Sequence, residues 1–262
     1  MLKKNRILCL LIVIVLVITF VSGCASSTNN TSTQKLIVGT NPEFPPFEFL
    51  DDNGNPDGFD MALIKEIGKR INMDVEIKSM EFKSLIAAVQ SGQINVIIAG
   101  MTYTEERAQS VNFSTPYYKA TQKVLIQKGN TSIKSVEDLN GKKIGVQDAT
   151  TGDFIASGDE GFEVTIEGAT VSRFKKYADA VLDLKNGRID AIIIDANPGK
   201  TFLGLNEDTL EMLSDPNDDM FGQEEYAIAI NKNDTELKTK IDKALEEIKN
   251  DGTYDKLIEQ YI

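Results

Sequence analysis

The sequence predicts an α/β protein with two open sheets in two lobes, joined by a two-strand hinge. Three observations lead to this prediction. Past residue 34, apolar runs alternate with segments whose apolar residues recur at helical spacing. A glycine turn running into a buried strand occurs twice, as GQINVIIAG (92–100) and GRIDAIIID (187–195). The helical segment 234–262 has no sheet of its own, so it must pack on an earlier one.

The first lobe begins with a β-α-β-α-β pattern. Its predicted strands are separated by helical patterns at 58–71 and 81–92, and a further short helix starts at Thr104. The acidic segment DDNGNPDG (51–58) is predicted to be a hairpin turn. The predicted strands are 35–40, 73–80 and 94–101.

The second lobe repeats this pattern. Strands are predicted at 142–147, 162–166 and 188–195, with helices near 152–158, 173–186 and 197–205. A last strand, 225–232, precedes the helical tail, which breaks at 250–252. We expect the chain to cross between lobes near 117–121 and 221–226. Residues 35–119 and 226–262 would then form lobe 1, and residues 120–225 lobe 2.

The N-terminus is predicted to be an export signal. Lys3, Lys4 and Arg6 precede the apolar run 7–21, and the run is followed by VSGC. This segment resembles a bacterial lipoprotein signal, in which residues 1–23 are removed and Cys24 is lipidated. The polar residues 24–34 would form a flexible tether. The alternative is an uncleaved anchor helix.

Composition excludes several classes of function. The formal net charge of −12 argues against binding nucleic acid. The chain has no histidine, and its two cysteines, Cys9 and Cys24, lie in the N-terminal segment, which excludes the Ser-His-Asp and Cys-His arrangements and thiolate metal sites in the folded part. The acidic turns 51–58 and 214–221 lack the glycine and glutamate of a calcium loop. No phosphate-binding glycine motif occurs, so we expect no cofactor and no metal.

The two repeated segments end differently, in Gly100 and in Asp195. Ligands of open α/β sheets bind beyond the carboxyl ends of strands, so both residues are predicted to face a shared cleft. A carboxylate that closes a run of isoleucines is costly unless it meets a cation. Asp195 is therefore a candidate partner for a positively charged ligand group, and its alternative role is to cap the helix near 197–205.

Six separated segments carry a resemblance to a known family. They are FPPFEF (44–49), GFD (58–60), AGMTYTEERAQSVNFSTPYY (99–118), GVQDATTG (145–152), GRIDAIIID and DGTYDKL (251–257). Together they resemble the polar amino-acid-binding proteins of ABC importers, the glutamine- and histidine-binding proteins among them. The resemblance covers residues 35–262 and implies a periplasmic-binding-protein type II-like fold. It also implies an extracytoplasmic receptor, expected to be monomeric, that closes on one amino acid and presents it to a membrane permease.

A dry cleft must pair both charges of a free amino acid. Arg107 is the natural partner of the carboxylate, because a guanidinium holds two oxygens at once, and it matches the arginine of the family. Its alternative role is that of an ordinary surface residue of its helix. Thr150, Thr151 and Gly152 enter a helix whose free N–H groups attract an anion.

On the other side of the ligand, Asp195 would meet the ammonium group. Gly100 would offer its carbonyl and allow close backbone approach, and Thr102 would add a hydroxyl.

The resemblance also suggests residues that surround the ligand side chain. Phe44 and Phe82 match positions where relatives hold it between aromatic faces. Asn41 stands where the glutamine and histidine binders carry aspartate, and Gln147 stands where the glutamine binder carries lysine. Because both are neutral here, an uncharged polar amino acid is favoured, although Glu43 nearby would attract a cation.

Two further interpretations remain open from the sequence. Cyclohexadienyl dehydratases resemble the same fold and use acidic groups in the same cleft, so an enzyme of that kind is one alternative. The other is an amino-acid sensor whose partner is a signalling receptor. The pairing of both ligand charges favours a binding protein that is not an enzyme.

Overall fold

The computed structural model describes residues 34–159, 162, 164, 166–214 and 220–262. The predicted signal 1–23, Cys24 and the tether up to residue 33 lie outside the described residues. The last residue assigned to the tether, Gln34, instead begins the first strand. Among the described residues, no helix combines the length and the hydropathy needed to cross a membrane.

The first lobe is built on a five-stranded mixed sheet with the order β4-β1-β5-β13-β6. Strand β1 is parallel to β4 and β5, whereas β13 is antiparallel to β5 and β6. A small hairpin, β2 with β3, forms at the predicted turn. The strands are β1 (Gln34–Thr40), β2 (Phe49–Leu50), β3 (Pro56–Asp57), β4 (Met73–Ser79), β5 (Val96–Ile97), β6 (Asn112–Phe113) and β13 (Ala229–Ile230).

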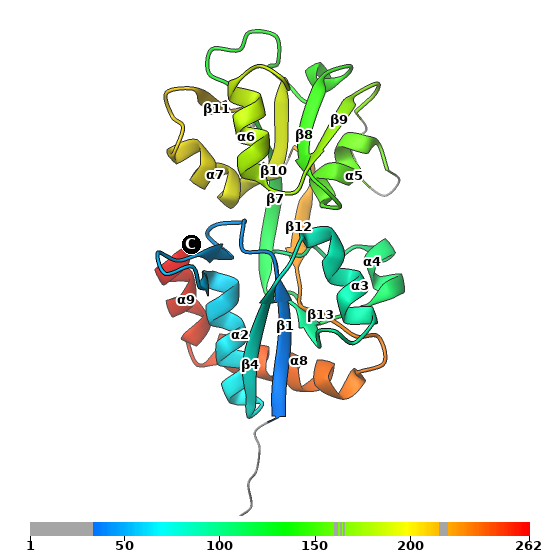
Figure 1. Ribbon diagram of the computed structural model, residues 1–262, viewed down its shortest axis with the longest axis vertical. Coiled ribbons are helices and arrows are strands. Elements are labelled where there is room, and N and C mark those ends of the chain that lie inside the picture. The colour runs from blue at the N-terminus through cyan, green and yellow to red at the C-terminus, as the bar shows by residue number, and fades with distance from the viewer. Residues whose placement is uncertain (1–33, 160–161, 163, 165, 215–219) are drawn as a thin grey trace, which may run out of the picture. The chain divides into compact units, whose positions relative to one another are not determined.

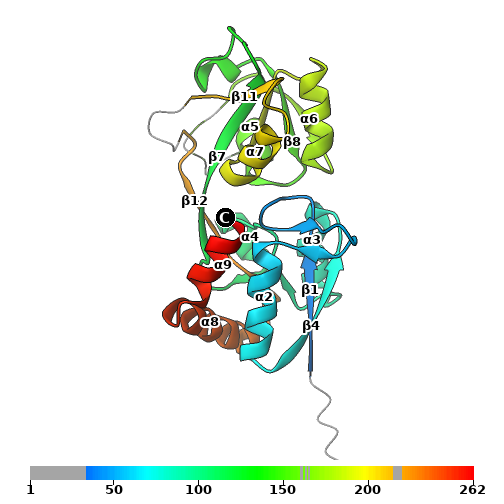
Figure 2. The same cartoon turned by 90° about the vertical axis from the view of Figure 1, so that its left-hand side faces the viewer.

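Helices cover both faces of this sheet. Helices α2, α8 and α9 pack together on one side, which faces the viewer in Figure 2, and α3 packs on β1 and β5. The C-terminal helices thus return to the first lobe, because the apolar face of α8 needs a sheet to cover it. The helices are α2 (Phe59–Arg70), a 3₁₀ turn (Phe82–Ser84), α3 (Leu85–Gln90), α4 (Glu105–Ser110), α8 (Thr235–Asn250) and α9 (Thr253–Tyr261).

The second lobe has a sheet of order β11-β7-β10-β8-β9. Helix α5 covers one face, and α6 and α7 cover the other (Figure 1). All five residues of β10 are buried, because helices lie on both faces, and this explains its run of isoleucines. The elements are β7 (Tyr118–Gln127), a 3₁₀ turn (Glu137–Leu139), β8 (Lys143–Gln147), α5 (Thr151–Ser157), β9 (Thr170–Phe174), α6 (Tyr177–Lys185), β10 (Ala191–Asp195), α7 (Ala196–Gly204), β11 (Leu210–Met212) and β12 (Gln223–Tyr226).

Two antiparallel strands connect the lobes. The first four residues of β7 pair with β12, from Tyr118 opposite Tyr226 to Thr121 opposite Gln223. The next five residues of β7 pair with β10 in the second sheet. Figure 1 shows β7 and β12 running from one lobe to the other, so these strands form the hinge region.

Residues 163 and 165 of the strand predicted at 162–166 lie outside the described residues, and Phe162, Val164 and Ile166 are not part of a strand. The strand that pairs with β8 is β9, at Thr170–Phe174, and α6 accordingly begins at Tyr177 rather than near 173. Ile166 is buried in the apolar core of the second lobe, and Phe162 and Val164 pack against it. Their apolar side chains therefore contribute to the packing of this core. The strand predicted at 94–101 is also shorter, at Val96–Ile97.

Candidate functional site

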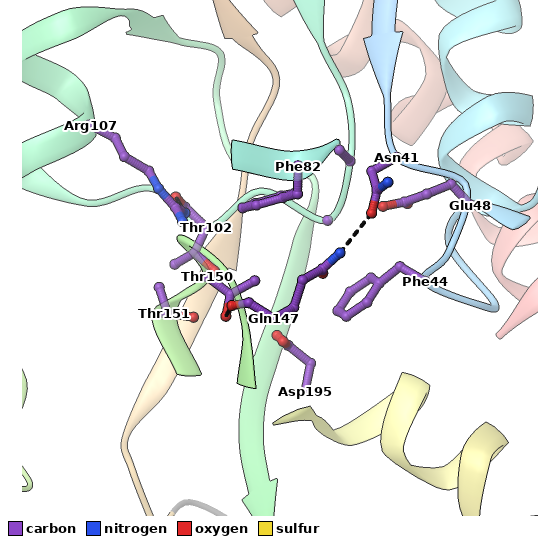
Figure 3. Close-up of a pocket in the computed structure, with 12 residues that line it drawn as sticks. Asn41, Phe44, Glu48, Phe82, Thr102, Arg107, Gln147, Thr150, Thr151 and Asp195 are labelled. Atoms are coloured by element: carbon purple, nitrogen blue, oxygen red, sulfur yellow. Dashed lines mark hydrogen bonds between the residues drawn. The ribbon is translucent and has the colours of Figure 1, made fainter. Parts of the chain in front are cut away.

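One cavity between the lobes gathers most of the residues predicted for the site. It contains ten of the eleven predicted binding residues together with Glu48 and Ala99 (Figure 3). The predicted residues that line it are Asn41, Phe44, Phe82, Gly100, Thr102, Arg107, Gln147, Thr150, Thr151 and Asp195.

Gly152 is the predicted residue that does not line the cavity. Helix α5 begins at Thr151, so Gly152 lies in its first turn rather than before it. Its Cα faces β10, where a Cβ atom would lie 3.1 Å from the carbonyl oxygen of Ile193. We conclude that this glycine lets α5 pack closely on the sheet.

Arg107 is held rigidly at one side of the cavity. Helix α4 begins after Thr104, whose hydroxyl accepts a hydrogen bond from the Arg107 backbone N–H. The guanidinium donates to the carbonyl of Thr102 at 2.7 Å and to that of Ala149, in the second lobe, at 2.9 Å. It lies over the rings of Phe82 and Phe154 and is 4% exposed, so its interpretation as a surface residue is wrong.

The guanidinium of Arg107 forms no ion pair with the described residues, although it is buried. Burial lowers its pKa to about 10, and nearby Glu224 and Asp195 partly oppose this shift. The side chain is therefore a cation at neutral pH. A ligand carboxylate at this position would supply the missing partner.

Asp195 ends β10 and precedes α7, but its side chain makes no capping hydrogen bond. Its Oδ1 instead accepts a hydrogen bond from the hydroxyl of Tyr226, at 2.5 Å. Burial, followed by the negative charge of Glu224, raises the pKa of Asp195 to about 7. The role of helix cap is thus excluded, and Figure 3 shows the carboxylate of Asp195 pointing into the cavity.

Asn41 and Gln147 bind each other across the cleft, as the dashed line in Figure 3 shows. The Nε2 of Gln147 donates to Oδ1 of Asn41 at 2.8 Å and to the carbonyl of Lys175 at 2.9 Å. Because both of its amide hydrogens are engaged, Gln147 has only Oε1 to offer a ligand.

Glu48 is a cavity residue that the sequence analysis missed as a candidate. It is 1% exposed, and neither carboxyl oxygen has a hydrogen-bond partner among the described atoms. Burial, and then the charge of Asp60, raise the pKa of Glu48 well above its usual range. An acidic residue within the apolar segment FPPFEF was the available signal, by the argument already used for Asp195.

Glu43, in contrast, does not line the cavity. Its carboxylate pairs with Lys176 of the second lobe at 2.5 Å. Two similar pairs connect the lobes, Lys83 with Asp148 and Lys175 with Glu81. Because these ion pairs are partly exposed, each contributes little free energy to holding the lobes together.

Gly100 permits the close packing behind the cavity. Its φ of +51° lies in the left-handed region, and a Cβ atom there would lie 2.8 Å from Cε1 of Phe44. Its backbone N–H donates to the carboxylate of Asp60 at 2.8 Å. The residue is therefore glycine for both conformational and steric reasons.

Gly100→Ala is expected to lower the free energy of unfolding by about 1 kcal/mol or more and to weaken ligand binding, because the ring of Phe44 must move into the cavity. Urea unfolding and calorimetry measure the two effects. Gly92→Ala is the matched control, since its φ is +75° but no atom lies within 4 Å of the new Cβ. Equal losses of stability in the two variants, with unchanged binding in Gly100→Ala, would contradict the steric argument.

Residues 36–262 match the family of bacterial extracellular solute-binding proteins, family 3. The chain belongs to this family. It is 37% identical to a probable histidine-binding protein of Campylobacter jejuni, a match that covers 92% of this chain and 89% of that protein.

Two solved structures extend the comparison. An ancestral arginine-binding protein bound to arginine is 43% identical, with a TM-score of 0.79, and the match covers 87% of this chain and 98% of that chain. A structure of an ancestral arginine-binding protein bound to glutamine is also 43% identical, with a TM-score of 0.77. This match covers 87% of this chain and 97% of that chain. These findings confirm the predicted two-lobed type II fold and the resemblance to polar amino-acid-binding proteins. The family 3 protein is thus a binding protein rather than an enzyme.

Proposed function

We propose that this family 3 protein captures a polar L-amino acid between its lobes and delivers it to the permease of an ABC importer. The observation that carries the proposal is the presence of two opposite charges in one cavity. Arg107 from the first lobe and Asp195 from the second are both buried, and neither forms an ion pair with a described residue. A zwitterionic amino acid would neutralise both at once.

The groups available to the ligand side chain are mainly acceptors. Gln147 retains Oε1, and Glu48 adds a buried carboxyl group whose ionised, acceptor form a cationic side chain would favour. We propose a side chain that donates N–H groups, such as those of glutamine, histidine or arginine. This widens the preference for an uncharged ligand, which was based on the neutrality of Asn41 and Gln147. The comparison proteins named for histidine and arginine, and the one bound to glutamine, are consistent with this choice.

A screen of the twenty amino acids by thermal shift, followed by calorimetry, tests this proposal. Glutamine, histidine or arginine should raise the melting temperature most, because the ligand binds only the folded protein, and aspartate and glutamate should have the least effect. Absence of any shift would overturn the proposed ligand class. Turnover of prephenate or arogenate would instead support the dehydratase alternative.

The extracellular family places the chain outside the cytoplasm, and we propose that a lipid on Cys24 attaches it to the cell membrane. The expected partner there is the permease, and the protein is expected to act as a monomer. Capture of the permease with the purified protein in the presence of its ligand would test the partnership.

Cys24→Ala is expected to move the protein from the membrane fraction to the medium or periplasm, because the lipid is the proposed attachment. Fractionation followed by immunoblotting measures the change. Cys9→Ala, which alters the predicted signal without removing the lipid site, should stay with the membrane. Retention of Cys24→Ala after a salt wash would show that the apolar run 7–21 is itself the anchor.

A further inference from the structure

Glu224 connects the two lobes at the hinge. It lies on β12, is 8% exposed, and its Oε2 accepts a hydrogen bond from the hydroxyl of Thr102 at 2.6 Å and from that of Thr151 at 2.9 Å. Thr102 belongs to the first lobe, whereas Thr151 begins α5 in the second. A single carboxylate oxygen on a hinge strand is therefore bonded to residues on both sides of the cleft.

These bonds determine what the two threonines can offer a ligand. A hydroxyl has one hydrogen, and in both residues it is directed at Glu224. Thr151 also accepts a hydrogen bond from Nε2 of Gln122 at 3.1 Å, which leaves its oxygen one lone pair. Both threonines line the cavity, so toward the ligand they can accept hydrogen bonds but cannot donate them.

The negative charge of Glu224 also favours a ligand group that is positively charged and donates hydrogen bonds. It is the first of the carboxylates that oppose the lowering of the pKa of Arg107, and it contributes to the raised pKa of Asp195. Among the described residues that line the cavity, Arg107 is the one cation, and it lies near the carboxylates of Glu224 and Asp195. An incoming ammonium group would reduce this excess of negative charge, whereas a neutral hydroxyl would not.

We propose that Glu224 is a positioning residue that makes the site specific for a ligand with an α-ammonium group. It holds the hydroxyls of Thr102 and Thr151 so that their oxygens accept from that group, and it links the lobes in the closed arrangement. The proposal rests on the proposed amino-acid-binding function and adds a requirement for the amino group.

Glu224→Gln is the test, because it keeps the size of the side chain but removes its charge and one of its acceptor oxygens. The neighbouring Glu225→Gln removes the same charge from an exposed position on β12 and serves as the control. Calorimetry would measure the affinity for L-glutamine, L-histidine and L-arginine, and for the 2-hydroxy analogue of each, in which a hydroxyl replaces the ammonium group.

We expect Glu224→Gln to reduce the preference for an amino acid over its 2-hydroxy analogue by about 10- to 100-fold, the effect of a hydrogen bond to a charged group, while Glu225→Gln leaves it unchanged. Small-angle scattering should show a less compact Glu224→Gln protein at equal ligand saturation. Equal losses of affinity for both ligands, with an unchanged preference, would show a purely structural role and overturn the proposal.

Thr102→Val provides a second variant if Glu224→Gln fails to fold. It removes one of the two acceptors while Glu224 keeps its bond to Thr151, so the preference should fall in the same direction. An unchanged preference in folded Thr102→Val would also overturn the proposal. Failure of the parent protein to bind any of the three amino acids is a different result, because it would overturn the proposed function itself.

Discussion

Arg107→Ala is expected to weaken amino-acid binding by about 2 to 5 kcal/mol, which is roughly a 30- to 5,000-fold loss of affinity. The ligand carboxylate would enter a site where the described residues provide no other cation within the cavity lining. The variant also leaves the carbonyls of Thr102 and Ala149 without their guanidinium donor, so the closed lobes lose a connection.

Calorimetry on the purified variant measures this loss. The affinity of Arg107→Lys should lie between those of the parent and Arg107→Ala. Lysine keeps the positive charge, but it lacks the planar guanidinium that can bind two carbonyls and a carboxylate together. Arg188→Ala is the matched control, since Arg188 is exposed and pairs with Asp183 away from the cavity. Full affinity in a folded Arg107→Ala protein would exclude this residue as the carboxylate partner.

Asp195→Asn should weaken binding by a similar amount and should also remove a pH dependence. The pKa of Asp195 is raised to about 7 in the empty protein, and an ammonium group favours the ionised carboxylate. Binding therefore releases a proton below about pH 7. The affinity of the parent should rise with pH through this range and level off above it, by up to about tenfold per pH unit on the acidic side.

Calorimetry between pH 5.5 and 8.5, in two buffers with different ionisation heats, measures both the affinity and the proton release. Asp190→Asn is the control, because Asp190 lies in the same repeated segment but does not line the cavity. This variant should keep the pH dependence of binding. The pKa of Asp60 is also raised, to about 6, mainly by burial. A pH dependence that persists in Asp195→Asn would therefore assign it to the neighbouring Asp60 and Glu48 rather than to Asp195.

Hydrophobic periodicity and the cost of burying charge predicted the fold and part of the site. Strand β10 carries isoleucines on both faces of the sheet because helices cover both faces. Asp195, the acidic residue that ends this strand, points into the cavity (Figure 3). Glu48 satisfies the same condition, because it is an acidic residue in the apolar segment FPPFEF, and it is buried and lines the cavity.

Other features depended on packing that local patterns do not describe. The residues FEVTI have the composition of a strand, yet the less apolar TVSRF forms the strand beside β8, and Ile166 is buried in the core. Strand propensity reflects how well a side chain fits a half-buried surface, so either segment could satisfy it.

By itself, the sequence determined the α/β class, the repeated lobe and the charged residues at the ends of strands, because hydrophobic periodicity and burial costs act over a few residues. Only the tertiary structure decided which polar groups remain available to a ligand. Asn41 and Gln147 are 106 positions apart, and Thr102 and Glu224 are 122 apart, yet each pair is hydrogen-bonded across the fold. A donor has a fixed number of hydrogens, so its use by a distant residue changes what the site can recognise, and no local pattern records that contact.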